Sequence, residues 1–196
     1  MKLRHLSALA LSLVACGAPD DGPGTLPIQE GHPQPKPPLS CSGIKPGPSP
    51  IRRLNRTEYN NTIRDLLGDT TRPADGFVRE EEQGGFNNNA DALGVTSILV
   101  EQYMRASEGV AQRATEHLET LLPCGVNGMD EAACVRGFIL TFGERAYRSP
   151  IDDDEVSRLY AVFVAGRSED FRTGVELLLQ TMLQSSRFLY LSLIHI

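Results

Sequence analysis

Apolar side chains recur every three or four residues through almost all of the chain after residue 50, and this helical periodicity constrains the fold most. The spacing predicts about five helices, which begin at Thr57, at Thr96 or Ser97, at Asp130, at Asp152 and at Ser168. The first, second and fourth are expected to end at Gly68, Pro123 and Gly166. Because no alternating segment of convincing length predicts a strand, the predicted fold class is all-α. Its helices would form a small bundle or two packed helical subdomains.

The fourth helix has the clearest predicted start. Asp152 is a good N-cap residue, and Glu155 three positions later completes a capping-box pattern. Ile151 and Val156 are spaced to pack against each other across the cap. The acidic residues Asp152 to Glu155 could suggest a calcium loop, but acidic side chains at a helix N-terminus also complement the helix dipole. The capping interpretation is therefore favoured.

Residues 1–15 have the features of a bacterial lipoprotein signal peptide. Lys2 and Arg4 precede an apolar stretch, Leu6 to Val14, that is too short to span a bilayer of about 30 Å. It ends in Leu13-Val14-Ala15-Cys16, the pattern of a lipobox, so we expect cleavage before Cys16 and lipidation of that cysteine. The alternative is an ordinary cleaved signal with a cysteine nearby.

Lipidation at Cys16 would make the membrane a partner of the mature chain, since two or more acyl chains give stable anchoring. The predicted location is therefore the bacterial cell envelope, after export. Gly17 follows Cys16 where an Asp would suggest retention at the inner membrane, so the outer membrane is favoured.

Residues 16–50 are predicted to form a disordered, Pro- and Gly-rich tether. Ten of the thirteen prolines lie in residues 17–50, which contain no aromatic residue, so this segment cannot bury enough apolar surface to offset its ordering entropy. Removal of Lys2 and Arg4 with the signal changes the formal charge from −6 to −8. Such an acidic chain predicts no nucleic-acid partner.

Two of the four cysteines, Cys124 and Cys134, flank a short Gly-, Asn- and Asp-containing loop between two predicted helices. Export permits disulfides, so we expect these two to pair; two free buried cysteines are the alternative. Cys41 has no evident partner in the chain and is either free or bonded to a cysteine beyond its end. No metal site is predicted, because no C-x-x-C pair occurs and His117 is interpreted as a solvent-facing helix residue.

The segment from Gly68 to Thr96 is predicted to be a long polar loop, with Phe77 and Phe86 as its large apolar anchors. Loops of this length are usually functional or mobile. Its acidic and amide side chains offer the oxygen ligands that Ca²⁺ prefers, although a solvated polar loop is the favoured interpretation. The candidate ligand-binding residues are Asp75, Glu80, Glu81, Glu82, Asn87 and Asn88.

Catalytic signatures are missing from the sequence. It contains no phosphate-binding loop, dinucleotide fingerprint, H-E-x-x-H, G-x-S-x-G or C-x-x-C-H motif, so no catalytic residue and no cofactor is predicted. A local basic cluster is formed by Arg52, Arg53, Arg56 and Arg64. Because Glu58, Asp65 and Asp69 lie among these arginines, we expect pairing within the molecule rather than phosphate binding.

Several runs resemble a known family. The run from Arg52 to Gly68 (RRLNRTEYNNTIRDLLG) resembles the opening signature of exported multidomain proteins of planctomycetes and myxobacteria that are built from PSD-type domains of unknown function. Gly85 to Ala90 resembles the rest of that first module, Phe142 to Pro150 the start of a second, and Leu183 to Tyr190 the junction into a third. The resemblance implies a first helical module over residues 51–123 and a second over residues 130–190.

The chain departs from the family pattern near its end. Ser186 stands where the family usually has Pro, and Leu191 where it has Arg. Residues 191–196 look non-native, which suggests a truncated gene. Some relatives carry a cytochrome c module, whose haem motif this chain lacks.

Two functions remain open from the sequence. The first is a helical binding or scaffolding module that presents its long loop to a protein or polysaccharide of the envelope. The second is the N-terminal fragment of an exported redox or degradative enzyme whose active residues lie in a missing C-terminal part. The lack of catalytic motifs favours the first.

Overall fold

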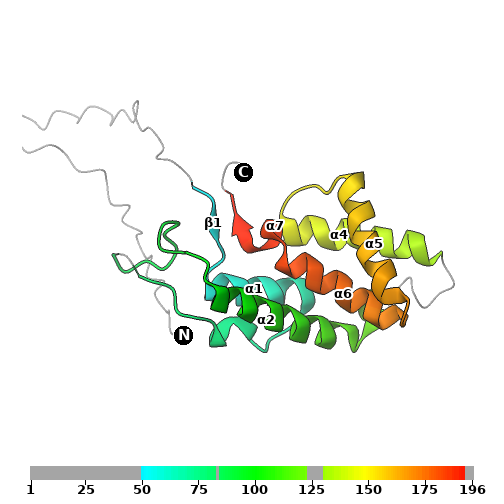
Figure 1. The fold of residues 1–196 in the computed structure, drawn as a ribbon, viewed down its shortest axis with the longest axis horizontal. Helices are drawn as coiled ribbons and strands as arrows, with labels where there is room; N and C mark the ends of the chain where they lie inside the picture. The colour runs from blue at the N-terminus through cyan, green and yellow to red at the C-terminus, as the bar shows by residue number, and fades with distance from the viewer. Residues whose placement is uncertain (1–49, 83, 123–129, 193–196) are drawn as a thin grey trace, which may run out of the picture. The chain divides into compact units, whose positions relative to one another are not determined.

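The computed structural model describes residues 50–82, 84–122 and 130–192 and is mostly helical, which confirms the all-α class (Figure 1). Its described part contains seven α-helices rather than about five, because two helices have only four residues each. The longer ones are α1 (Arg56–Leu67), α2 (Ser97–Thr115), α4 (Glu131–Tyr147), α5 (Asp153–Arg167) and α6 (Phe171–Gln184). The short ones are α3 (Leu118–Leu121) and α7 (Ser186–Leu189). A 3-10 helix, η1, covers Pro73–Gly76.

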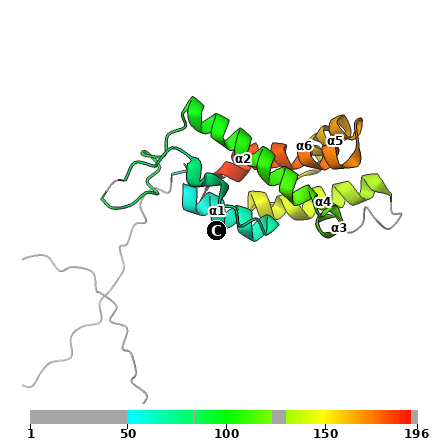
Figure 2. The same ribbon diagram turned by 90° about the horizontal axis from the view of Figure 1, so that it is seen from below.

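Helix α6 lies at the centre of the packing. It contacts both α5 and α2, and its side chains Leu178, Leu179, Met182 and Leu183 are completely buried. Figure 2 shows α2 lying along α6, with α1 and α4 on the same side of that pair. One hydrophobic cluster includes residues from all five of the longer helices, among them Ile63, Val110, Ile139, Phe163 and Leu178. The two predicted modules therefore share a core.

A short antiparallel pair of strands joins the segment before α1 to the segment after α7. Strand β1 (Arg52–Arg53) pairs with β2 (Tyr190–Leu191), with Arg53 opposite Tyr190. The Leu54 N–H donates to the Leu189 carbonyl over 2.7 Å and continues the pairing. Segments that are far apart in the sequence are thus fixed side by side at the start of α1.

Two of the predicted helix caps are wrong. Helix α1 begins after Asn55, not Thr57: the Asn55 side chain accepts from the Glu58 N–H, and the Glu58 carboxylate accepts from the Asn55 N–H. Helix α6 begins after Asp170, not Ser168, because Asp170 accepts from the Thr173 N–H over 2.8 Å. The predicted N-cap Asp152 is confirmed, because it accepts from the Glu155 N–H. The helix predicted to begin at Asp130 does so, with Asp130 as its N-cap, which accepts from the Ala132 N–H.

The second predicted helix is divided in two. Helix α2 ends at Thr115, whose hydroxyl donates to the Ala111 carbonyl of the preceding turn. The chain turns at Glu116 and His117 before α3 begins, so His117 lies between helices instead of on one. Its side chain is 74% exposed, which agrees with the solvent-facing interpretation.

Other predictions fall outside the described residues. Cys16, Cys41, Cys124 and the predicted tether up to residue 49 lie there, so lipidation and the disulfide stay predictions. Cys134 is buried in the first turn of α4. None of the helices in the described part of the chain is both long and apolar enough to cross a bilayer.

Candidate functional site

The loop between α1 and α2 is fastened to the core in its first half. Gly68 ends α1 in the left-handed region (φ 71°) and reverses the chain. The buried Asn60 amide accepts from the Ala74 N–H and donates to Asp75, each over 2.8 Å. Gln102 on α2 bonds both the Val78 N–H and the Gly76 carbonyl. This part of the loop is therefore held in one conformation.

Only one of the two expected aromatic anchors is buried. Phe77 is 7% exposed and packs edge-on against Tyr59 and Tyr103, with ring centroids 5.4 and 5.1 Å away. Phe86 is 68% exposed, so its prediction as an anchor is wrong. Leu93, which is 4% exposed, is instead the buried apolar residue of the second half of the loop.

Glu80 is buried, contrary to the expectation of a solvated loop. Its side chain is only 7% exposed and accepts from the Arg56 N–H, at the N-terminus of α1, over 2.8 Å. The Arg53 guanidinium, itself 4% exposed, lies 3.8 Å away. Because a carboxylate complements both the free N–H groups and the dipole of a helix N-terminus, Glu80 fastens the loop to α1.

The sequence-predicted residues meet at a polar hollow of about 300 Å³ beside the N-terminus of α1. Asp75, Glu80, Glu82 and Asn87 line it, whereas Glu81 and Asn88 do not. Its other lining residues, which were not predicted from the sequence, are Arg56, Thr57, Arg72 and Arg79. Three carboxylates and three guanidinium groups thus face one small volume with no net formal charge.

Several of these groups are already engaged inside the molecule. The Arg72 guanidinium, 2.8 Å from Asp75, holds the pKa of that carboxyl below its usual value. Arg56 donates to the carbonyls of Ala74 and Asp75, which fixes its guanidinium over η1. Asp75, Glu80 and Arg56 consequently shape the hollow.

Two charged residues of the hollow are not engaged by other side chains and can contact a ligand. Across the described residues, no ion pair within 4.0 Å and no side-chain hydrogen bond engages Arg79 or Glu82. Both side chains are exposed. The hollow therefore offers a guanidinium that can donate hydrogen bonds and a carboxylate that can accept them. The Asn87 amide also lines the hollow, and its oxygen accepts from Asn55 over 3.2 Å.

The acidic residues that the structure describes are not grouped as metal ligands. Nowhere in residues 50–82, 84–122 and 130–192 do three or more His, Cys, Asp or Glu side chains gather as metal ligands. The oxygens of Asp75 and Glu80 instead accept from Arg72, Asn60 and Arg56. The arginines of the hollow were the signal that was missed in the sequence. Two of them, Arg72 and Arg79, lie shortly before the acidic run, but only the fold brings Arg56 next to Glu80.

Two family models match the chain. Residues 52–116 match PSD3, described as a protein of unknown function (DUF1587), and residues 134–192 match PSD5, described as a protein of unknown function (DUF1595). The chain therefore contains two PSD-type domains, as the runs beginning at Arg52 and Phe142 predicted. No curated protein and no solved structure matches the chain.

Proposed function

We propose that this chain is a lipid-anchored binding module of the bacterial cell envelope, and that the polar hollow of the α1–α2 loop holds part of an envelope polysaccharide. The observation that carries the proposal is the pair of unengaged residues, Arg79 and Glu82, on a loop that is otherwise fastened to the core. A rigid scaffold that presents free polar groups on a loop is the usual construction of a binding site. The lipobox at Cys16 supports the anchoring.

A polysaccharide fits the hollow better than a charged ligand does. Its lining has three positive and three negative side chains, so neither an anion nor a cation gains from the net field. Sugar hydroxyls both donate and accept hydrogen bonds, which matches a guanidinium beside a carboxylate and an amide.

Phe86 does not itself line the hollow, but it is the sequence neighbour of Asn87, which does, and we propose that its ring adds an apolar contact to a longer sugar chain. The Phe86 ring is the most exposed among the large hydrophobic side chains of the described residues. An aromatic ring gives a large contact area at a small cost in conformational entropy. An envelope protein is the alternative occupant.

Sedimentation of the full chain with purified peptidoglycan sacculi, and with extracted outer polysaccharide, tests the binding. The variant with Arg79→Ala and Glu82→Ala should lose at least tenfold in affinity, since hydrogen bonds to charged groups contribute about 1.5–3 kcal/mol each. Glu81→Ala is the matched control, because Glu81 is exposed and does not line the hollow. If neither polysaccharide sediments the wild-type chain, or if the control loses as much, the polysaccharide proposal is wrong.

Replacement of Cys16 tests the anchor separately. Cys16→Ser should move the protein from the membrane fraction to the soluble fraction and remove acyl labelling. A variant that still sediments with membranes would show that the anchor lies elsewhere.

A further inference from the structure

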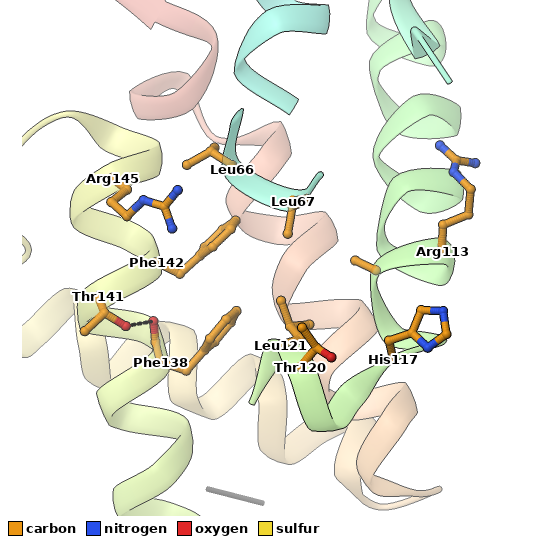
Figure 3. A pocket seen from close by; sticks show the side chains of 11 residues that line it. Leu66, Leu67, Arg113, His117, Thr120, Leu121, Phe138, Thr141, Phe142 and Arg145 are labelled. Atoms are coloured by element: carbon orange, nitrogen blue, oxygen red, sulfur yellow. Dashed lines mark hydrogen bonds between the residues drawn. The ribbon is translucent and has the colours of Figure 1, made fainter. Parts of the chain in front are cut away.

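A second hollow, of about 490 Å³, lies at the other end of α1 (Figure 3). We call it the α1–α4 groove. Since α1 has twelve residues, the groove lies roughly 15 Å along the helix from the polar hollow. Its volume falls within the range of about 300–1,000 Å³ that is typical of small-molecule sites. Its lining residues are Leu66, Leu67, Arg113, Ala114, His117, Thr120, Leu121, Phe138, Thr141, Phe142 and Arg145.

The walls of the groove are mostly apolar. Phe138 and Phe142 lie one turn apart on α4 and stack, with ring centroids 5.2 Å apart and planes inclined by 16°. Figure 3 shows the two rings facing Leu67 and Leu121 across the hollow. Phe138, Leu66, Leu67 and Leu121 are only partly buried, so each leaves apolar surface open to the groove. A hydrocarbon group placed there would remove this surface from water.

Every ionisable residue in the lining is basic. Arg113 is neutralised, because its guanidinium donates to the Asp69 carboxylate over 2.7 Å. Arg145 is not neutralised: its guanidinium donates to the Asp65 carbonyl over 3.0 Å, and no carboxylate of the described residues lies within 4.0 Å of it. Figure 3 shows its guanidinium beside Phe142 and Leu66, at the edge of the apolar wall. Four of its five N–H donors remain for a ligand.

The C-terminus of α1 also lies at the groove, close to the positive charge of Arg145. The C-terminus of α1 carries a partial negative charge that would oppose an anion. Two of its last four carbonyls accept hydrogen bonds, however: the Arg64 carbonyl from the Gly68 N–H over 2.8 Å, and the Asp65 carbonyl from Arg145. The Arg145 guanidinium therefore lies at the mouth of the groove with no carboxylate of the described residues within 4.0 Å.

We propose that the α1–α4 groove binds a small amphipathic carboxylate, whose hydrocarbon chain packs against Phe138 and Phe142 and whose carboxylate pairs with Arg145. Apolar walls with one unneutralised cation at their edge select for this combination of a short chain and one negative charge. The site is separate from the polar hollow and does not depend on polysaccharide binding, so either proposal can fail without the other.

Three eight-carbon probes that differ only in their head group test whether the groove prefers a negatively charged ligand. Isothermal titration calorimetry of the full chain should detect octanoate binding at one site. Octanol should bind at least tenfold more weakly, and octylammonium should not bind, because its charge repels Arg145. If octylammonium binds as tightly as octanoate, or if octanoate does not bind, the proposal is wrong.

Three variants test the position of the site. Arg145→Gln should lower octanoate affinity at least tenfold and leave octanol affinity unchanged. Arg158→Gln removes the same charge from an exposed position on α5 outside the groove and should leave both unchanged. Ala114→Leu keeps every charge but fills the groove, so it should abolish binding of both probes. Equal octanoate affinity in the Arg145→Gln and Arg158→Gln proteins, or unchanged binding to Ala114→Leu, would overturn the assignment. Melting curves without ligand check that each variant is folded.

Discussion

The buried guanidinium of Arg53 lies 3.8 Å from the buried carboxylate of Glu80, and the two residues join strand β1 to the middle of the loop between α1 and α2. Arg53 also donates to the carbonyls of Leu93 and Gly94, near the far end of the same loop, over 3.2 Å. A single arginine therefore holds two points of the loop against the start of α1. The shape of the polar hollow depends on this arrangement.

Replacement of Glu80 should destabilise the fold. Glu80→Ala leaves the Arg53 charge buried without a carboxylate and the Arg56 N–H without its acceptor, and breaking a buried pair costs about 3 kcal/mol or more. Urea unfolding monitored by circular dichroism measures the loss. The exposed neighbour provides the comparison: Glu81→Ala should change the free energy of unfolding by no more than about 0.5 kcal/mol. Equal effects of the two substitutions would contradict the structural role of Glu80.

The close approach of α5 and α6 gives a second prediction. A Cβ atom built on Gly166 would lie 2.8 Å from the Thr173 carbonyl oxygen, which is backbone and cannot move without shifting α6. Gly166→Ala should therefore cost about 1–3 kcal/mol despite the better helix propensity of Ala.

A glycine in open space is the control for this effect. Gly137 is exposed within α4, and a Cβ atom there would meet nothing within 4 Å. Gly137→Ala should raise the free energy of unfolding by about 1 kcal/mol, because Ala favours the helix. Thermal melts of both variants should thus shift in opposite directions, and a shift in the same direction would show that α5 and α6 are not in such close contact.

Much of the helical framework could be predicted from the sequence, because caps and apolar periodicity are local signals. Asp152 caps the helix that it was expected to cap, and a helix begins at Asp130 as expected. The missed cap of α1 was also visible, since Asn55 and Glu58 have capping-box spacing two residues before the predicted start.

Long-range partners could not be predicted in the same way. Glu155 was expected to complete a capping box with Asp152, but its carboxylate accepts from Arg187, 32 residues later. The Arg187 guanidinium also donates to Ser149 and to the Pro150 carbonyl, each over 2.8 Å. Likewise, the composition of a run of glutamates predicts that all of them are exposed to solvent. Only the folded structure shows that Glu80 is buried against Arg53. The candidate site therefore combined predicted acidic residues with arginines that no local pattern placed there.

Acid should weaken the contact between Asp69 and Arg113. Partial burial alone would raise the pKa of Asp69, but hydrogen bonds from Thr71 and the Arg113 guanidinium outweigh it and lower that pKa. A carboxyl whose pKa is lower in the folded state stabilises the fold above its unfolded value of about 4, and this contribution is lost as the pH falls below that value.

Asp69→Asn isolates this contribution. At pH 7 the variant should unfold at lower urea concentration than the wild type, and the difference should shrink as the pH falls from 5 to about 3. Asp65→Asn is a suitable control, since Asp65 is exposed on α1 and pairs with the exposed Arg64. A difference between wild type and Asp69→Asn that stays constant over this range would remove Asp69 as the titrating group.

The predicted disulfide between Cys124 and Cys134 closes a loop of about ten residues and should contribute about 2–3 kcal/mol by restricting the unfolded chain. Cys134 is buried in the first turn of α4, so the bridge would fasten that turn to the segment after α3. Mass mapping of a non-reduced digest should show the two peptides joined, and reduction should lower the melting temperature by several degrees. The double variant Cys124→Ser, Cys134→Ser should melt at the reduced temperature with or without reductant. If both thiols of the folded wild-type protein react with an alkylating reagent, the two cysteines are not paired.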